Sequence, residues 1–265
     1  MANNNDDKSH VDESQVSTPA QSSEARMPFM LHLKELRDRL VRSCIALVIA
    51  VGLALFIFGE NLIELLKRPA PEGTQFYAIT VMENIGVWFK VSLWAGIIIA
   101  MPFLVYQFFS YLAPGLTSKE KKFIFSILPA VTFMFIAGVA FAYFIAMPPA
   151  LGFLLHFGDE TIAIPTIRIS DYIDVATRLL LGVGLIFETP IIITALAQLG
   201  IVSPQWLAGR RKIWIVLAFI IAALVTPTPD PINQGIIAIP LILLLELGIL
   251  MARVVYKKKR AVPAG

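Results

Sequence analysis

The sequence lacks the residues that covalent cross-links, metal sites and common catalytic centres require. It has a single cysteine, Cys44, inside an apolar run, which excludes a disulfide framework. Its three histidines, His10, His32 and His156, lie far apart in the chain and show no metal-ligand spacing. A Gly-rich phosphate loop is missing, and no Ser/His or Cys/His pair is recognisable as a nucleophile with its base. The sequence therefore predicts no cofactor, no catalytic residues and no enzyme activity.

Charged residues are also scarce, at 15% of the chain, while 57% of the residues are hydrophobic. The charges gather in short clusters between apolar runs, and several runs reach about 18 residues, which is enough to cross the hydrocarbon layer of a membrane. The alternating pattern of membrane-barrel strands is absent. So is an N-terminal signal peptide, because the first apolar run begins only near Leu40. These features predict an all-α, polytopic membrane protein with no nucleic-acid partner.

Composition divides the chain into three parts. Residues 1–26 are polar and acidic with almost no large apolar side chains, which predicts a disordered tail. Residues 27–256 hold all the long apolar runs and are predicted to form the membrane domain. Residues 257–265 form a short basic tail. We find no repeat between the two halves of the membrane domain, which disfavours an inverted-repeat transporter.

An amphipathic segment, Pro28 to Leu40, precedes the first apolar run. Its apolar residues recur at spacings of three and four, which places them on one helical face. We therefore expect an amphipathic helix that leads directly into the first span and lies along the membrane interface. Six spans are predicted after it, at roughly 41–58, 85–109, 123–147, 172–199, 213–225 and 236–251. The last two reach only about 20–24 Å against a hydrocarbon core of about 30 Å, so we expect local thinning of the bilayer beside them.

The lysines and arginines near the span ends predict the orientation, since they concentrate on the cytoplasmic side of a membrane. One set of loops is rich in them, at 34–42, 119–122, 210–212 and 253–260. The opposite set holds only Lys67, Arg68 and Arg168. The bias predicts that both termini are cytoplasmic.

Two carboxylates, Glu35 and Glu120, fall on this predicted cytoplasmic side. Each has a simple interpretation as a solvated charge, paired with Arg39 one turn away or with the lysines around position 120. Together they can instead receive two guanidinium groups, because arginine offers a planar fork that matches a carboxylate and lysine does not. The residues alone leave both interpretations open.

Glu188 lies near the middle of the predicted fourth span, where a charged side chain costs about 2.5 kcal/mol or more. It is expected either to face a polar cavity or a partner, or to be buried against polar groups of a neighbouring helix. Pro190 is expected to bend this span, and Arg178 to pair with Asp174. Asp230 is either a helix N-cap or a functional residue. For Glu246 the sequence favours neither function nor packing.

Seven segments in order resemble motifs of the TatC family, the signal-receptor subunit of the twin-arginine protein translocase. They are HLKELRDRL at 32–40, YLAPGLTSKE at 111–120, FETP at 187–190, GIVSP at 200–204, TPTPD at 226–230, AIP at 238–240 and ELG at 246–248. The resemblance runs from about Phe29 to Tyr256. It implies six tilted helices in a concave, glove-like arrangement in the cell inner membrane.

The resemblance also implies a function and its residues. The chain would bind Arg-Arg signal peptides on the cytoplasmic face and export folded proteins on the proton-motive force. Its partners would be TatA- and TatB-type single-span subunits, other TatC copies and membrane lipids. By position, the signal-binding residues would be Glu35, Leu36, Arg37, Tyr111 and Glu120. Glu188 would be the membrane-embedded glutamate, and Pro69 and Asp230 functional residues of the outer loops.

A second hypothesis is a secondary transporter or channel that uses Glu188 as an ion or proton site. Purified protein in liposomes would then move a small solute unaided. A membrane-embedded enzyme is a third class, and it has no recognisable catalytic grouping in this sequence.

Overall fold

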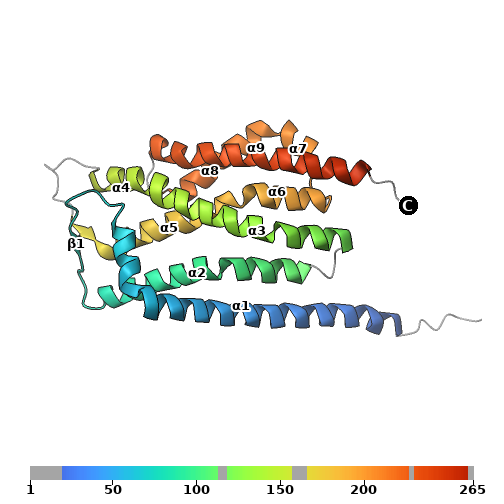
Figure 1. Cartoon of the computed structure of the whole chain (residues 1–265), viewed down its shortest axis with the longest axis horizontal. Helices are drawn as coiled ribbons and strands as arrows, with labels where there is room; N and C mark the ends of the chain where they lie inside the picture. Colours follow the sequence, from blue (N-terminus) through green and yellow to red (C-terminus); the bar gives the residue numbers. More distant parts are fainter. Residues whose placement is uncertain (1–19, 113–117, 157–165, 227–229, 262–265) are drawn as a thin grey trace, which may run out of the picture.

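The structure, a computed structural model, describes residues 20–112, 118–156, 166–226 and 230–261. Long helices run side by side along the molecule (Figure 1), as expected for apolar runs that must satisfy their own backbone polar groups in hydrocarbon. The helices are α1 (Ala20–Lys67), α2 (Glu83–Leu112), α3 (Ser118–Phe141), the π-helical η2 (Ala142–Ala146), α4 (Met147–His156), α5 (Ile169–Phe187), α6 (Thr189–Gln198), α7 (Pro204–Gly209), α8 (Arg211–Val225) and α9 (Pro231–Ala261). Two short strands, β1 (Phe76–Tyr77) and β2 (Ile167–Arg168), pair in parallel.

The molecule has two unlike ends (Figure 1). The strand end carries β1 with its partner β2, together with α4. The terminal end carries the N-terminal part of α1, the C-terminal end of α2, the start of α3 and the C-terminal end of α9. Between the two ends, side chains of α2, η2, α4, α5, α8 and α9 share one core, which includes Val91, Met147, Ile173, Leu179 and Ile237.

Five helical segments are long and apolar enough to cross a membrane, among the residues that the structure describes. They are α1, α2, α3 continued through η2 and α4, α5 continued through α6, and α9. The remaining membrane helix is α8, which has 15 residues and is the fifth span in chain order. Its shortness confirms the prediction of a short fifth span. The prediction of a short sixth span is wrong, because α9 has 31 residues. Expected thinning of the bilayer therefore rests on α8 alone.

The amphipathic segment 28–40 is helical and leads directly into the first span, as predicted, and its location along the membrane interface stays a prediction. The structure shows α1 as one uninterrupted helix of 48 residues from Ala20 to Lys67, because no breaking residue separates the amphipathic part from the apolar run. The helix begins inside the range predicted as a tail, and residues 1–19 lie outside the described part. At the other end of the chain, α9 likewise continues to Ala261, inside the predicted basic tail.

Close packing holds α1 against α2, its neighbour in space (Figure 1). A Cβ atom added to Gly96 of α2 would lie 2.7 Å from the Cα of Val51 in α1. Only glycine lets the two backbones approach this closely. Gly59 of α1 serves the same purpose in the other direction, since any side chain there would collide with the Trp88 indole.

The third span also continues further than predicted. Pro148 and Pro149, expected in a loop, are the second and third residues of α4. In the first turn of a helix that continues directly from the one before it, a proline removes a backbone hydrogen bond to the preceding turn. Here the π-helical turn η2 comes directly before that turn, which is a common way for a helix to absorb an irregularity without ending.

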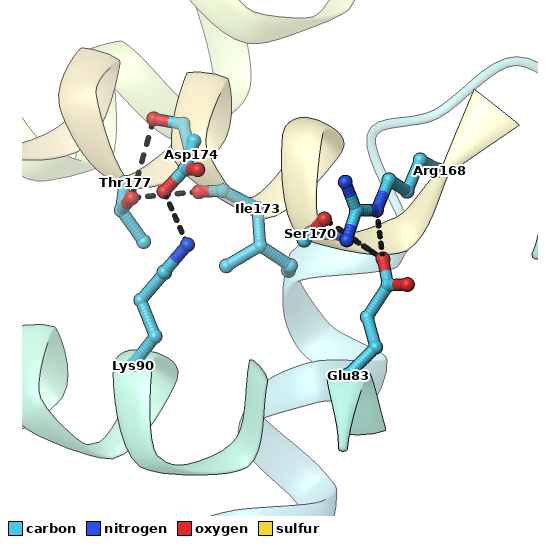
Figure 2. Close-up of polar contacts among 7 residues, drawn as sticks. All are labelled: Glu83, Lys90, Arg168, Ser170, Ile173, Asp174 and Thr177. Atoms are coloured by element: carbon cyan, nitrogen blue, oxygen red, sulfur yellow. Dashed lines mark hydrogen bonds and ion pairs between the residues drawn. The ribbon is translucent and has the colours of Figure 1, made fainter. Parts of the chain in front are cut away.

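A buried carboxylate ties the strand end together. Glu83, the first residue of α2, has a side chain only 2% exposed. One of its oxygens accepts hydrogen bonds from Arg168 Nε (2.8 Å) and Ser170 Oγ (2.8 Å), as Figure 2 shows. The other accepts from the backbone N–H of Ile79 (2.8 Å) and Thr80 (3.3 Å). Glu83 therefore joins the loop before α2 to β2 and the start of α5.

We predict that Glu83→Gln destabilises the fold, because the neutral amide removes the counter-ion of Arg168 and cannot accept on both atoms the hydrogen bonds that the buried carboxylate accepts. The melting temperature of the purified chain should fall by roughly 5 °C or more. A matched control is Glu64→Gln, whose exposed carboxylate lies 4.0 Å from Arg68 and which should change the melting temperature very little. Equal melting temperatures for the two variants would contradict this role of Glu83.

Candidate functional site

The structure brings the backbone of the predicted signal-binding residues to one end of the molecule. Glu35, Leu36 and Arg37 belong to α1, Tyr111 is the penultimate residue of α2, and Glu120 lies in the first turn of α3. All three segments meet at the terminal end (Figure 1). Residues 113–117 and the side chain of Glu120 lie outside the described part of the structure.

The Glu35 carboxylate pairs with Arg39 one helical turn later. Its Oε1 atom accepts hydrogen bonds from Arg39 Nε (3.0 Å) and Arg39 Nη2 (2.6 Å). The same guanidinium reaches α2, where its Nη1 donates to Oε1 of the buried Gln107 at 3.4 Å. The two charged side chains remain 30% and 22% exposed. The simple ion pair considered from the sequence is therefore present, at a junction between α1 and α2.

Apolar and aromatic side chains also lie on the helices that carry this ion pair and on α3. Leu36 is 41% exposed on α1, and its neighbour Arg37 is exposed and bonded to Asp38 at 2.9 Å. On α2, Tyr106 stacks at 5.8 Å against Phe125 of α3, and Tyr111 is half-buried. The result is a partly open surface in which a carboxylate lies among leucine and aromatic side chains.

Glu188 lies at a break in the fourth span, as predicted from Pro190. Helix α5 ends at Phe187 and α6 begins at Thr189, and the Glu188 carbonyl accepts the first bonds of the new helix from Ile191 and Ile192 (both 3.0 Å). Its side chain is buried, and its Oε1 atom has no hydrogen-bond partner among the described residues. An unsatisfied buried carboxylate oxygen is costly and calls for a functional explanation.

The packing around this break leaves no room for a residue larger than glycine at position 248 of α9. A Cβ atom at Gly248 would lie 2.9 Å from the Cα of Pro190, so α9 crosses directly over the start of α6. The glycine of the ELG motif thus has a structural reason. Glu188 is held between packed helices rather than facing open solvent.

The predicted outer-loop residues lie away from the other candidates. Pro69 is half-buried in the turn that follows α1 at the strand end. Asp230 directly precedes α9, and its Oδ2 accepts a hydrogen bond from the backbone N–H of Asn233 at 2.9 Å. The N-cap interpretation of Asp230 is therefore confirmed. The structure does not join Pro69, Asp230 and Glu188 with the terminal-end residues into one site.

Several polar pairs were missed or misassigned from the sequence. Asp174 pairs with Lys90 of α2 at 2.7 Å, so the predicted pair with Arg178 is wrong. Glu246 of α9 binds Arg211 of α8 through two bonds of 2.6 and 2.9 Å. These partners are distant in sequence and leave no periodic signal that could have identified them. No group of three or more His, Cys, Asp or Glu among the described residues could hold a metal ion.

Comparison with known proteins agrees with the fold and the motifs. Residues 31–240 match the family model described as Sec-independent protein translocase protein (TatC). Among curated proteins of that name, the chain is 40% identical to the one from Desulforapulum autotrophicum (89% of this chain, 88% of the relative). It is 38% identical to the Aquifex aeolicus protein (89% and 99%) and 33% identical to the Escherichia coli protein (90% and 93%).

Two solved structures are also similar. One is titled "Crystal Structure of Twin Arginine Translocase Receptor- TatC", with a TM-score of 0.71 and 36% identity over 84% of this chain and 99% of that one. The second, of the same receptor in DDM, gives a TM-score of 0.73 and 37% identity over 83% and 99%. The chain therefore belongs to the TatC family of Sec-independent protein translocase proteins.

Proposed function

We propose that this chain is the receptor subunit of a twin-arginine translocase. It binds Arg-Arg signal peptides at its terminal end and, with TatA- and TatB-type subunits, exports folded proteins using the proton-motive force. The solved relatives titled as twin-arginine translocase receptors support this proposal. The observation that carries it is a partly exposed carboxylate, Glu35, whose partner Arg39 bonds to α2, at the same end of the molecule as the start of α3.

Glu35 can accept an incoming guanidinium without a large desolvation cost. Both bonds from Arg39 fall on Oε1, and Oε2 makes no hydrogen bond to the described residues. A signal-peptide arginine can bond to Oε2, or displace Arg39 toward Gln107, which Arg39 already contacts. The exchange keeps each charge paired. Glu120, on the neighbouring helix start, is the proposed receptor for the second arginine.

The side chains near Glu35 suit the rest of such a peptide. Leu36 and the ring of Tyr111 offer apolar contacts to the hydrophobic residues that follow an Arg-Arg pair. The charge of Arg37 is compensated by Asp38, so Arg37 does not strongly repel the incoming arginines. In this proposal the two guanidinium groups set the specificity, because a lysine cannot form two parallel bonds to one carboxylate.

The proposed orientation places the terminal end in the cytoplasm and the chain in the cell inner membrane. Cationic side chains gather at that end, including Lys121 and Lys122 at the start of α3, Lys212 at the start of α8 and Arg253 near the end of α9. Such a bias marks the cytoplasmic side of a multi-pass protein. Pro69 and Asp230 then belong to the outer side, where we propose that they shape the outer loops.

Glu188 is the proposed contact for a single-span partner inside the membrane. Its unpartnered Oε1 can accept a hydrogen bond from a polar side chain of a TatA- or TatB-type helix, and such bonds between membrane helices favour association. The transporter hypothesis draws on the same carboxylate. Both uses require the packing around Glu188 to open, because this residue is only 5% exposed, and the experiment on Glu188→Gln distinguishes them.

We predict that Glu35→Gln and Glu120→Gln each weaken the binding of an Arg-Arg signal peptide roughly 10- to 150-fold, the value of one charge-assisted hydrogen bond. Photo-crosslinking from position 111 to the peptide measures the effect, with a Lys-Lys peptide as comparison. Glu64→Gln, which removes an exposed carboxylate of the same helix, serves as the control. Unchanged crosslinking in both variants, with the protein still inserted in the membrane, would refute the proposed receptor site.

We predict that Glu188→Gln reduces the recovery of a single-span partner with the purified chain roughly threefold to tenfold, while crosslinking of the signal peptide from position 111 stays unchanged. The melting temperature should not fall, because a neutral amide replaces an unsatisfied carboxylate. Glu60→Gln, on the exposed surface of α1, is the matched control. Solute flux through liposomes that hold the chain alone, lost in Glu188→Gln, would instead support a transporter.

A further inference from the structure

An apolar groove lies between α1, α2, the α3–η2 helix and α5 near the strand end. Its volume is about 390 Å³, and its walls include Leu62, Trp94, Ile136, Tyr143 and Leu181. Four of the lining residues are strongly exposed: Leu65 (42%), Ile99 (49%), Ile136 (57%) and Phe144 (72%). The groove therefore opens sideways, toward the lipid that surrounds a membrane protein.

The length of the groove matches half of a bilayer. Along α2 its lining runs from Val91 to Ile99, which is about 12 Å of helix. The hydrocarbon of one leaflet is about 15 Å thick, half of the whole core. A partner helix that spans the membrane would need a groove about twice as long, so the dimensions favour a lipid acyl chain as the occupant.

Charged side chains mark the end of this groove that is nearer the strand end. Lys90 directly precedes Val91 on α2 and pairs across the gap with Asp174 of α5 at 2.7 Å (Figure 2). Thr177, one turn after Asp174, already lines the groove. The ion pair therefore lies between α2 and α5 at the end of the groove nearer the strand end. Its two charges neutralise each other.

Arg178 adds a charge that this pair does not compensate. It is exposed on α5, between the lining residues Thr177 and Leu181, and it forms no ion pair or hydrogen bond with the described residues. Asp171, the next acidic residue on the same face, lies seven positions earlier, about 10 Å further toward the strand end. An arginine on a membrane helix without a counter-ion is costly and calls for an anion or water.

From its position on α5, an arginine at residue 178 can extend toward the membrane surface at the strand end and reach a lipid phosphate there. Arg178 lies nine residues after the start of α5, about 14 Å along the helix. The Cα–Cβ bond of a helical residue tilts toward the helix N-terminus, which for α5 is the strand end. A long arginine side chain extends further in that direction. An arginine side chain extended in this direction would reach toward the level of Asp174, which lies four residues earlier on α5 and pairs with Lys90.

We propose that the groove holds one acyl chain of an anionic phospholipid whose headgroup phosphate is bound by Arg178. The lipid belongs to the leaflet at the strand end, which is the outer leaflet in the orientation proposed above. The acyl chain covers the exposed lining residues, and the guanidinium binds phosphate oxygens in the bidentate geometry that arginine favours. This site does not depend on signal-peptide binding and lies at the opposite end of the molecule from Glu35.

Trp94 provides a direct probe, because its indole lines the groove. The chain with Trp94 as its single tryptophan is made by replacing Trp88, Trp206 and Trp214 with phenylalanine. It is reconstituted in vesicles that contain either phosphatidylglycerol or phosphatidylcholine with brominated acyl chains, which quench tryptophan on contact. We expect the anionic lipid to quench Trp94 at about fivefold lower mole fraction, the contribution of one cation near a membrane surface.

Two substitutions separate the headgroup from the acyl chain. Arg178→Gln should remove the preference for phosphatidylglycerol and leave quenching by either lipid. Arg253→Gln, an exposed arginine near the end of α9, should keep the preference. Ala95→Phe fills the groove and should reduce quenching by both lipids.

Native mass spectrometry of the chain with all four tryptophans gives a second measurement that does not depend on folding of the single-tryptophan variant. A retained phosphatidylglycerol molecule that is lost in Arg178→Gln supports the site. Equal quenching by both brominated lipids in the unsubstituted groove would overturn the role of Arg178. No quenching by either lipid would mean that protein covers the groove and would overturn the proposal as a whole.

Discussion

The fold depends on the rule that a polar group inside a bilayer must find its partner within the protein. Two ion pairs and one hydrogen bond from a charged side chain follow this rule by connecting neighbouring helices, and each joins different elements. Arg39 links Glu35 to Gln107 across α1 and α2, Lys90 joins α2 to Asp174 of α5, and Arg211 joins α8 to Glu246 of α9. Because water is scarce in hydrocarbon, each pair specifies which helices lie side by side as well as adding stability.

Glu188 does not follow this rule, because its buried Oε1 atom has no hydrogen-bond partner among the described residues. As a subunit of a Sec-independent protein translocase, the chain is a component of membrane transport and not an enzyme, so a catalytic role does not explain the orphaned carboxylate. In the proposed function the packing around Glu188 opens to a partner helix, and an unsatisfied polar atom lowers the cost of doing so. The break at Pro190 adds a point where α5 and α6 can move relative to each other.

Local patterns in the sequence predicted features that depend on residues close together in the chain. The apolar runs located the membrane helices, and Pro190 located the break in the fourth span. Asp230, after two prolines in a short turn, had a helix N-cap as one of its two interpretations. Features that depend on distant partners were not predictable. Glu83 and Arg168 are 85 residues apart, and no periodicity connects them.

The predicted first and sixth spans were shorter than α1 and α9 for a related reason. Hydropathy alone treats polar residues as the end of a span, but Gln234 lies inside α9 because its side-chain amide donates to the Phe219 carbonyl of α8 at 2.7 Å. Likewise, the charges of segment 28–40 looked like a boundary, yet Glu35 and Arg39 pair with each other along the same helix. A satisfied polar residue continues a helix that an isolated one would end.

The continuity of α1 has a mechanical consequence. From Glu35 to Lys67 the helix covers 32 residue steps, about 48 Å of path without an intervening loop. Between Glu35 and Lys67, Val51 lies in close contact with the backbone of α2 at Gly96, near the centre of α1. The last turns of α1 bend away from its long axis before the chain leaves the helix (Figure 1), so the contact at Val51 fixes the position of the long part of α1 against α2.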